Sequence, residues 1–203
     1  MKNPTRERLV EAARVLFWKH GYSSTGIAQI LKEADAGSGS LYYFFPTKED
    51  LLLAVLEWYR ENLWAQVIQP VFDRVSDPIE RIFALLARYR DALEMTDCLY
   101  GCPIGSLALE IHEPDPPVRE MLRVNFDGWI AAVEGCFAVA RDRLPADCDR
   151  RGLAVLTLNV MEGGVMQART SRDINAFDRS VAMLRDYVTR LEREAKTSMG
   201  ERP

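Results

Sequence analysis

Hydrophobic residues recur along most of this chain at the spacing of three to four residues that one face of an α-helix requires. In the first segment Leu9, Ala12, Ala13, Leu16 and Phe17 form such a stripe. No segment alternates apolar and polar residues for long enough to indicate a β-strand. The pattern therefore predicts an all-α fold of about nine helices.

Three short helices are expected within the first fifty residues. Gly21 can take the backbone angles that end the first helix, and Thr25 offers a hydroxyl that could cap the second. Asp35 tolerates left-handed angles and so marks a turn before a third helix over 38–44, which Pro46 ends. Two short helices joined by a tight turn are the plan of the helix-turn-helix motif.

The rest of the chain is expected to form six longer or intermediate helices. Thr47 can cap the first of them, over 48–67, with Asp50 completing an imperfect capping box. Asp77 and Pro78 are a typical cap and first residue of the next helix. The remaining tail, KTSMGERP, is expected to fray. The later helices are predicted over about 77–95, 104–112, 117–143, 149–168 and 176–195.

The stretch ADAGSGSLYYFFPTKEDLL, residues 34–52, places small residues directly before four aromatic ones. Small side chains allow a backbone to approach DNA closely, and the N–H groups at a helix N-terminus bind phosphate. Leu41 and Phe45 are four residues apart and should face a core, which leaves Tyr42 and Tyr43 pointing elsewhere. Lys48 opposes the dipole of its helix, so it is best explained as a phosphate ligand.

Charge separates the two ends of the chain. The net charge is −4, but residues 1–48 carry +3 and residues 49–203 carry −7. A small positive module on an acidic body fits a protein that touches nucleic acid in one place only.

Residues 6–52 resemble the DNA-binding domain of the TetR family of transcriptional regulators, through RLVEAARVLFWKHGYSSTGIAQILKEA, GSLYYFF and TKEDLL. GCPIGSLALEI, residues 101–111, is similar to a branch that includes drug-responsive and electrophile-responsive repressors. The resemblance implies phosphate contacts from Thr25, Tyr42 and Lys48, base reading by Ser38, Ser40 and Tyr43, and a close backbone approach at Gly37.

The sequence also departs from the family pattern. Asp35-Ala36-Gly37 stands where Gly-Val-Ser is usual, so a capping hydroxyl is missing, and Phe44 replaces a frequent histidine. With serines at the reading positions, recognition would depend on van der Waals contact, water and DNA shape.

The resemblance implies a DNA-binding domain over 1–47 and an effector-binding and dimerisation domain over 48–203, connected by the helix 48–67. The segment 153–165 is apolar on nearly all sides, which predicts that a second subunit buries it in a four-helix bundle. A two-fold dimer suits a palindromic operator. The expected interface residues are Leu153, Leu156, Val160, Gly164, Val181, Leu184 and Val188.

A small, largely apolar effector is expected to bind among the middle helices and to release a repressor from its operator. Tilting of the helix 48–67 would carry the signal. The candidate ligand residues are Trp64, Tyr89, Cys102, Ile111, Phe126, Trp129, Met161 and Met166.

Other functions stay open. Cys102 lies four residues after Cys98 and could sense oxidants or electrophiles, although no cationic neighbour in sequence lowers its pKa. An enzyme is disfavoured because no catalytic motif is present, and a helical small-molecule-binding dimer without DNA binding is a further alternative. No metal site or cofactor is expected. The charged N-terminus and the lack of long apolar runs indicate a cytoplasmic protein.

Overall fold

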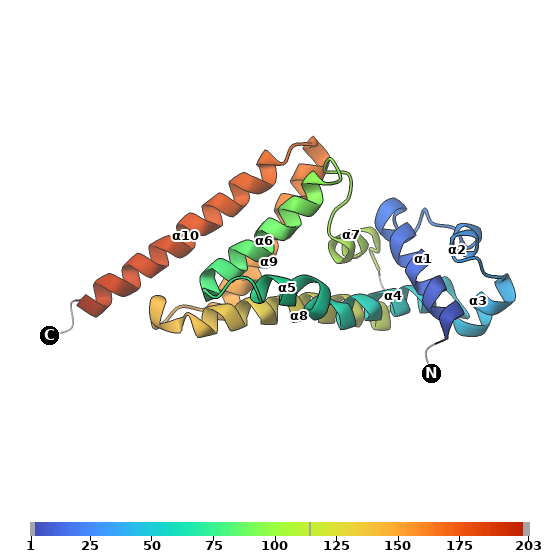
Figure 1. The fold of residues 1–203 in the computed structure, drawn as a ribbon, viewed down its shortest axis with the longest axis horizontal. Coiled ribbons are helices and arrows are strands. Elements are labelled where there is room, and N and C mark those ends of the chain that lie inside the picture. Colours follow the sequence, from blue (N-terminus) through green and yellow to red (C-terminus); the bar gives the residue numbers. More distant parts are fainter. Residues whose placement is uncertain (1–2, 114, 201–203) are drawn as a thin grey trace. The chain divides into compact units, whose positions relative to one another are not determined.

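Helices supply all the regular secondary structure of the described residues, which confirms the predicted all-α fold (Figure 1). The computed structural model describes residues 3–113 and 115–200, with side chains through Ser198. Counting α4, η1 and α5 as one continuous helix gives the expected nine among the described residues. The elements are α1 (Pro4–His20), α2 (Ile27–Glu33), α3 (Ser38–Phe44), α4 (Lys48–Leu63), the π-helical turn η1 (Trp64–Ile68), α5 (Gln69–Phe72), α6 (Pro78–Glu94), α7 (Pro103–Glu110), α8 (Pro116–Val139), the 3₁₀ turn η2 (Arg141–Arg143), α9 (Arg150–Ser171) and α10 (Asn175–Gly200).

The chain packs as two compact units. The first comprises Met1–Asn62 and Cys102–Phe126, and the second comprises Leu63–Gly101 and Asp127–Pro203. These packing boundaries differ from the predicted boundary between the DNA-binding and effector-binding domains after residue 47. The predicted boundary concerns function and stays a prediction.

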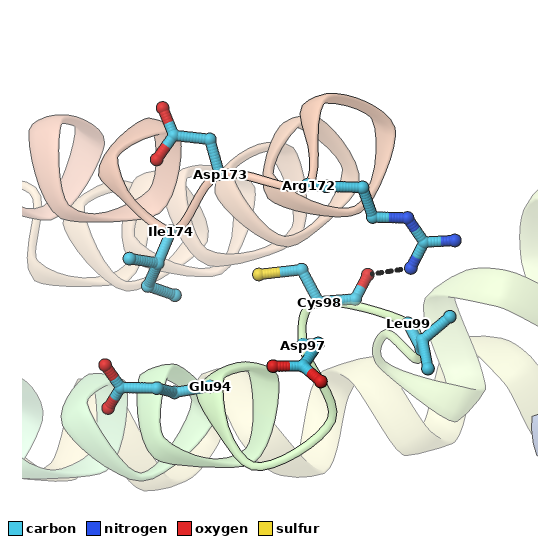
Figure 2. Close-up of a pocket in the computed structure, with 7 residues that line it drawn as sticks. All are labelled: Glu94, Asp97, Cys98, Leu99, Arg172, Asp173 and Ile174. Atoms are coloured by element: carbon cyan, nitrogen blue, oxygen red, sulfur yellow. Dashed lines mark hydrogen bonds between the residues drawn. The ribbon is translucent and has the colours of Figure 1, made fainter.

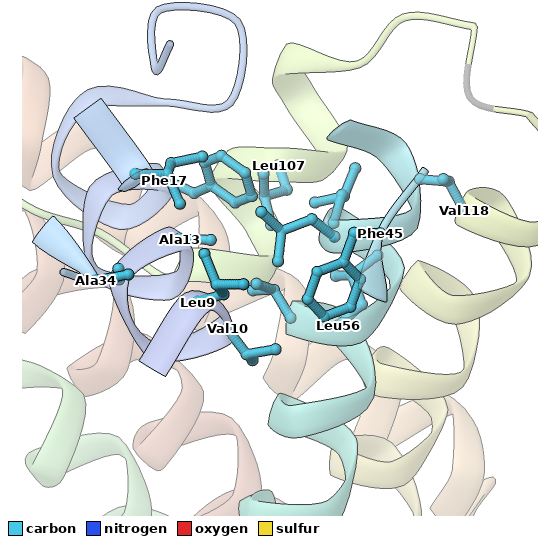
Figure 3. Close-up of a cluster of buried hydrophobic side chains, with 14 of the residues drawn as sticks. Leu9, Val10, Ala13, Phe17, Ala34, Phe45, Leu56, Leu107 and Val118 are labelled. Carbon is cyan, nitrogen blue, oxygen red and sulfur yellow. The ribbon is translucent and has the colours of Figure 1, made fainter. Parts of the chain in front are cut away.

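The core of the first unit explains why its packing extends beyond residue 47 (Figure 3). The helices α2 and α3 have only seven residues each, too few to enclose an apolar core. Leu107 of α7 and Val118 of α8 are buried in the same cluster as Leu9 and Phe17 of α1. The segment 102–126 therefore completes the core of the N-terminal helices.

Local backbone chemistry sets the ends of α1, α2 and α3. Gly21 ends α1 at a φ of 86°, and its N–H donates to the carbonyl of Phe17. Asp35 has a φ of 45°, which confirms the predicted turn before α3. The guanidinium of Arg8 holds this turn, since Nε donates to the Ala34 carbonyl at 2.9 Å. Three separate groups thus fix the two connections of the motif.

The helix that begins at Lys48 runs further than predicted. It continues through η1 and α5 to Phe72 instead of ending near residue 67. Pro70 has no N–H to donate to the carbonyl four residues earlier, so the ladder widens and the Gln69 N–H donates to Trp64. The carbonyl of Gln66, which Pro70 cannot bond, accepts from Arg88 at 2.7 Å. A side chain from α6 thereby compensates for the proline.

Three helices, α6, α9 and α10, pack on one another in the second unit. Gly164 of α9 lies so close to Phe177 of α10 that a Cβ would be 2.9 Å from Cδ2 of the ring. The expectation that KTSMGERP frays is wrong for residues 196–200, which continue α10, while residues 201–203 lie outside the described residues. None of the described helices has the length and apolar character of a membrane-spanning segment.

Candidate nucleic-acid interface

The helix α3 divides its side chains between a core face and an open face, as predicted. Leu41 and Phe45 are buried, whereas Tyr42 is 53% and Tyr43 81% exposed. Phe44 is half-buried and meets the Tyr43 ring edge to face, with centroids 4.9 Å apart. An exposed pair of tyrosines on a two-turn helix offers ring faces and hydroxyls to a partner outside the protein.

No side chain caps the N-terminus of α3. Gly37 occupies the cap position without a side-chain hydrogen bond, and Ser38 follows it exposed to solvent. Apart from the adjacent chain and the backbone of α3 itself, no described atom lies within 4 Å of where a Cβ would stand at Gly37 or Gly39. The φ of Gly37 is −82°, so its backbone conformation does not require glycine. Ser40 is half-buried on the next turn. A nucleic-acid backbone could approach this surface closely.

Thr25 corrects two expectations. It is 1% exposed, and its Oγ1 donates to the Gly21 carbonyl at 2.7 Å and to the Leu16 carbonyl at 3.3 Å. The cap of α2 is Gly26, whose N–H donates to the Gln29 side chain at 2.8 Å. A buried hydroxyl that is already bonded cannot reach a phosphate, so Thr25 holds the connection between α1 and α2.

The start of α4 carries the predicted capping box. The Asp50 carboxylate accepts from the Thr47 N–H at 2.9 Å, and the Asp50 N–H donates to the Thr47 hydroxyl at 3.1 Å. Lys48, the first residue of α4, points back toward the α1–α2 turn, residues 21–26. Its ammonium donates to the Tyr22 carbonyl at 2.5 Å and lies 4.2 Å from the centroid of that ring. Desolvation lowers the Lys48 pKa, and the nearby carboxylate of Glu110 opposes this shift.

Glu110, the last residue of α7, is a site residue that sequence reasoning missed. Its carboxylate accepts from the backbone N–H of Tyr22 at 2.8 Å and of Ser23 at 2.6 Å. Burial alone would raise its pKa, but these two hydrogen bonds and Lys48 outweigh that effect and lower it. Gly21 leaves the space, because a Cβ there would lie 2.9 Å from Oε2. Nothing in the sequence around Glu110 signals this contact.

The predicted ligand residues do not form one group. Cys102, Ile111 and Phe126 belong to the first unit, and the other five belong to the second. Trp64 and Met166 are about half-exposed, whereas Met161 is buried. The remaining two are Tyr89 and Trp129.

Tyr89 and Trp129 make an edge-to-face pair with ring centroids 6.4 Å apart. Trp129 is 3% exposed, and its indole Nε1–H has no acceptor among the described residues. A buried donor without a partner costs about 1–3 kcal/mol, so it calls for an explanation. A bound molecule that carries an acceptor would supply one.

A groove of about 600 Å³ lies between the end of α6 and the α9–α10 turn (Figure 2). Asp97, Cys98 and Arg172, which line it, have positive φ angles. The Arg172 guanidinium donates to the Cys98 carbonyl at 2.8 Å and so joins the two strained turns. None of the predicted ligand residues lines this groove. Its three carboxylates, from Glu94, Asp97 and Asp173, make it unfavourable for an anion.

The predicted dimer residues need correction as well. Four of the seven are buried inside the second unit and are not available to another subunit: Leu153, Gly164, Leu184 and Val188. Helical periodicity identified an apolar stripe but not which neighbour covers it. Leu156 is exposed, and Val160 and Val181 are half-buried. Met166, Met183 and Tyr187 are also exposed and were not assigned to the interface.

The four cysteines form no disulfide. Burial raises the pKa of Cys98 and Cys148, and raises that of Cys136 to about 11. Cys102 is half-buried and occupies the cap position of α7. Across the described residues, no three His, Cys, Asp or Glu side chains are placed to hold a metal ion.

The short α2 and α3, the tight turn at Asp35 and the open face of α3 define a helix-turn-helix protein. Residues 9–55 match the profile described as bacterial regulatory proteins, tetR family. Residues 78–184 match the profile described as tetracyclin repressor-like, C-terminal domain. Together these profiles extend over most of the chain.

Individual proteins similar to this chain are transcriptional regulators as well. The HTH-type transcriptional regulator YxaF of Bacillus subtilis is 31% identical over 173 residues, covering 85% of this chain and 88% of its own length. LmrA of the same organism is 30% identical over 170 residues, covering 83% and 88%. The regulatory protein TetR from Rhodobacter sphaeroides superposes with a TM-score of 0.79 at 25% identity, covering 90% of this chain and 97% of that one. The chain belongs to the TetR family and is a helix-turn-helix transcriptional regulator.

Proposed function

We propose that this regulator is a repressor that binds a palindromic operator as a homodimer and is released by a small, largely apolar effector. The observation that carries the proposal is the open face of α3, with its bare N-terminus and its exposed tyrosines. Both tyrosines lie outside the core, where a partner can reach them. The matched profile is that of bacterial regulatory proteins, which work where the chromosome is, so the proposed location is the cytoplasm. No catalytic role is proposed.

The DNA contacts follow from this surface. Ser38, Ser40 and Tyr43 would face base edges, while Gly37 lets the backbone come close. Tyr42 would reach phosphate through its hydroxyl. Lys48 would do so through its ammonium, which has three donors and uses one on Tyr22.

For the effector, the second unit offers the Tyr89–Trp129 pair. An aromatic ring presented edge-on and a buried N–H without an acceptor suit a flat molecule with a carbonyl or similar group. Filling that bond would remove the cost of the unsatisfied donor. An effector of this kind would be held in one orientation, because the indole donates in a single direction.

Dimerisation would use the exposed apolar side chains of α9 and α10. Leu156 and Met166 lie on α9, Met183 and Tyr187 lie on α10, and Met183 alone is 68% exposed. Large apolar side chains on two adjoining helices favour burial against a second copy. Met183→Glu should shift sedimentation at micromolar concentration from dimer to monomer without loss of helix content. A dimer that persists would place the interface elsewhere.

A second candidate function rests on Cys102. It is half-buried and occupies the cap position of α7, so a small reagent can reach its sulfur from solvent. In this reading, alkylation or oxidation of Cys102 would release DNA in place of a bound effector. Cys102→Ser would then keep DNA binding but lose its response to N-ethylmaleimide, while Cys148→Ser would keep both.

Fluorescence anisotropy on DNA from upstream of the protein's own gene tests the main proposal. We expect tight binding that falls steeply with salt. The Tyr42→Phe, Lys48→Ala double variant should bind about tenfold more weakly, with a salt slope lower by about one. Lys196→Ala removes the same charge from α10 and should change neither quantity. Weak, sequence-indifferent binding by the unaltered protein would refute the repressor.

A further inference from the structure

Two groups hold the peptide units of Tyr22 from opposite sides. Its N–H donates to the Glu110 carboxylate, and its carbonyl accepts from the Lys48 ammonium. Ser23 donates to the second oxygen of the same carboxylate at 2.6 Å. Charge-assisted hydrogen bonds to both carboxylate oxygens fix orientation as well as distance. The turn is thus held by the end of α7 and by the start of α4.

The contact joins residues that lie far apart along the chain. Glu110 is 88 residues from Tyr22 and lies on α7, a helix packed in the first unit. On both sides the chain leaves the segment 102–126 for the second unit, at Gly101 and at Asp127. A displacement of either junction is therefore passed covalently to this segment. The apolar contacts of Leu107 anchor α7 to the core, and the Glu110 carboxylate joins α7 to the turn by accepting from its backbone N–H groups.

We propose that Glu110 is a positioning residue for DNA binding: through it, α7 holds the α1–α2 turn and places Lys48 for its phosphate contact. This role rests on the proposed function. When α7 shifts, the carboxylate leaves Tyr22 and Ser23, the Tyr22 carbonyl turns away, and Lys48 loses the acceptor that orients it. Tilting of the helix that starts at Lys48 is the predicted route by which effector binding changes DNA binding. The contact of Glu110 adds a second route, which acts on the first residue of that helix.

Backbone amide hydrogen exchange tests the hydrogen bonds between Glu110 and the turn without DNA. In Glu110→Ala the Tyr22 and Ser23 amides should exchange at least tenfold faster than in the unaltered protein. Glu110→Gln keeps one acceptor oxygen without the charge, so its rates should fall in between. Glu120→Gln is the matched control, because it removes a carboxylate that pairs with Arg123 on the surface of α8 in the same unit. Unchanged exchange in Glu110→Ala would overturn the proposal whether or not DNA binds.

A double-mutant cycle tests the DNA half on the same upstream fragment, at a temperature where circular dichroism shows every variant folded. Glu110→Ala should lower affinity severalfold and the salt slope by about one, as we expect for Lys48→Ala alone, with Glu110→Gln intermediate. The variant with both substitutions should bind no more weakly than Lys48→Ala alone, since the two changes remove one contact. Additive losses of DNA affinity would overturn the positioning role and leave Glu110 with a structural role only. If the unaltered protein does not bind this DNA, the proposed function fails, and so does the DNA role of Glu110. Amide exchange still tests the hydrogen bonds between Glu110 and the turn separately.

Discussion

Replacing Gly164 by alanine tests how closely α9 and α10 pack. A Cβ at this position would stand 2.9 Å from Cδ2 and 3.4 Å from the Cα of Phe177. Ordinary carbon contacts are about 3.5–4.0 Å, so the new methyl overlaps the ring by roughly half an ångström or more. The tight contact is with the ring, whereas the Cα of Phe177 at 3.4 Å is close to an ordinary contact. Because Phe177 is buried, its ring has little room to turn away, and the ring or α10 must move.

The magnitude combines two opposing effects. Overpacking of a closed core costs about 1–3 kcal/mol. Alanine in a helix interior is better than glycine by about 1 kcal/mol. The net expectation is a loss of about 0–2 kcal/mol in the free energy of unfolding. Gly135→Ala is the matched control, because Gly135 lies inside α8 and no described atom is within 4 Å of its Cβ position. That variant should gain about 0.5–1 kcal/mol.

Urea unfolding at one fixed protein concentration should measure the difference between the two variants. We expect Gly164→Ala to be less stable than Gly135→Ala by about 1–3 kcal/mol, because helix propensity cancels between them. Equal stability of the two would refute the close approach of α9 and Phe177.

Three further predictions concern the first unit. The folded-state pKa of Glu110 is lowered, so its stabilisation is complete above its ordinary value of 4.5 and is lost as pH falls through the folded value. The stability gap between the unaltered protein and Glu110→Gln should then be constant from pH 8 to 6 and shrink toward pH 3; a gap that widens on acidification would contradict this sign. Gly37→Ser should stabilise by a few tenths of a kcal/mol, since its extended backbone and open surroundings admit a capping hydroxyl, and no gain in thermal melting would count against that geometry. Asn125→Ala should cost about 1–2 kcal/mol in urea, because its buried amide donates to the carbonyls of Leu56 and Met121, and a neutral result would mean that these bonds contribute nothing.

Local chemistry made much of the fold predictable. The Asp77 cap, the Thr47–Asp50 box and the left-handed Asp35 depend only on residues within a few positions of one another. The open face of α3 followed from the spacing of Leu41 and Phe45. These features need no knowledge of the tertiary structure, so a single sequence specifies them.

What failed depends on which of several possible partners a side chain meets. Thr25 carries a hydroxyl suited to a cap or a phosphate, and only the fold shows that the nearby carbonyls of Gly21 and Leu16 already accept from it. Leu184 and Val188 would form an apolar stripe whether they met the same chain or a partner. In the structure they are buried within the chain, where α9, α6 and η2 pack on α10. The Glu110 contact spans 88 residues, and a glutamate at a helix end gives no sign of it.

The core of the first unit also sets the order in which the chain can mature on the ribosome. Leu9, Phe17 and their neighbours are synthesised long before Leu107, Val118 and Leu122, which complete the same cluster. At about 5–20 residues per second, the interval from residue 62 to residue 126 lasts roughly 3–13 s. During that time the nascent N-terminal helices expose an unfinished apolar surface. A premature stop before α8 would leave this surface open for good, and such fragments should be targets for chaperones and proteases.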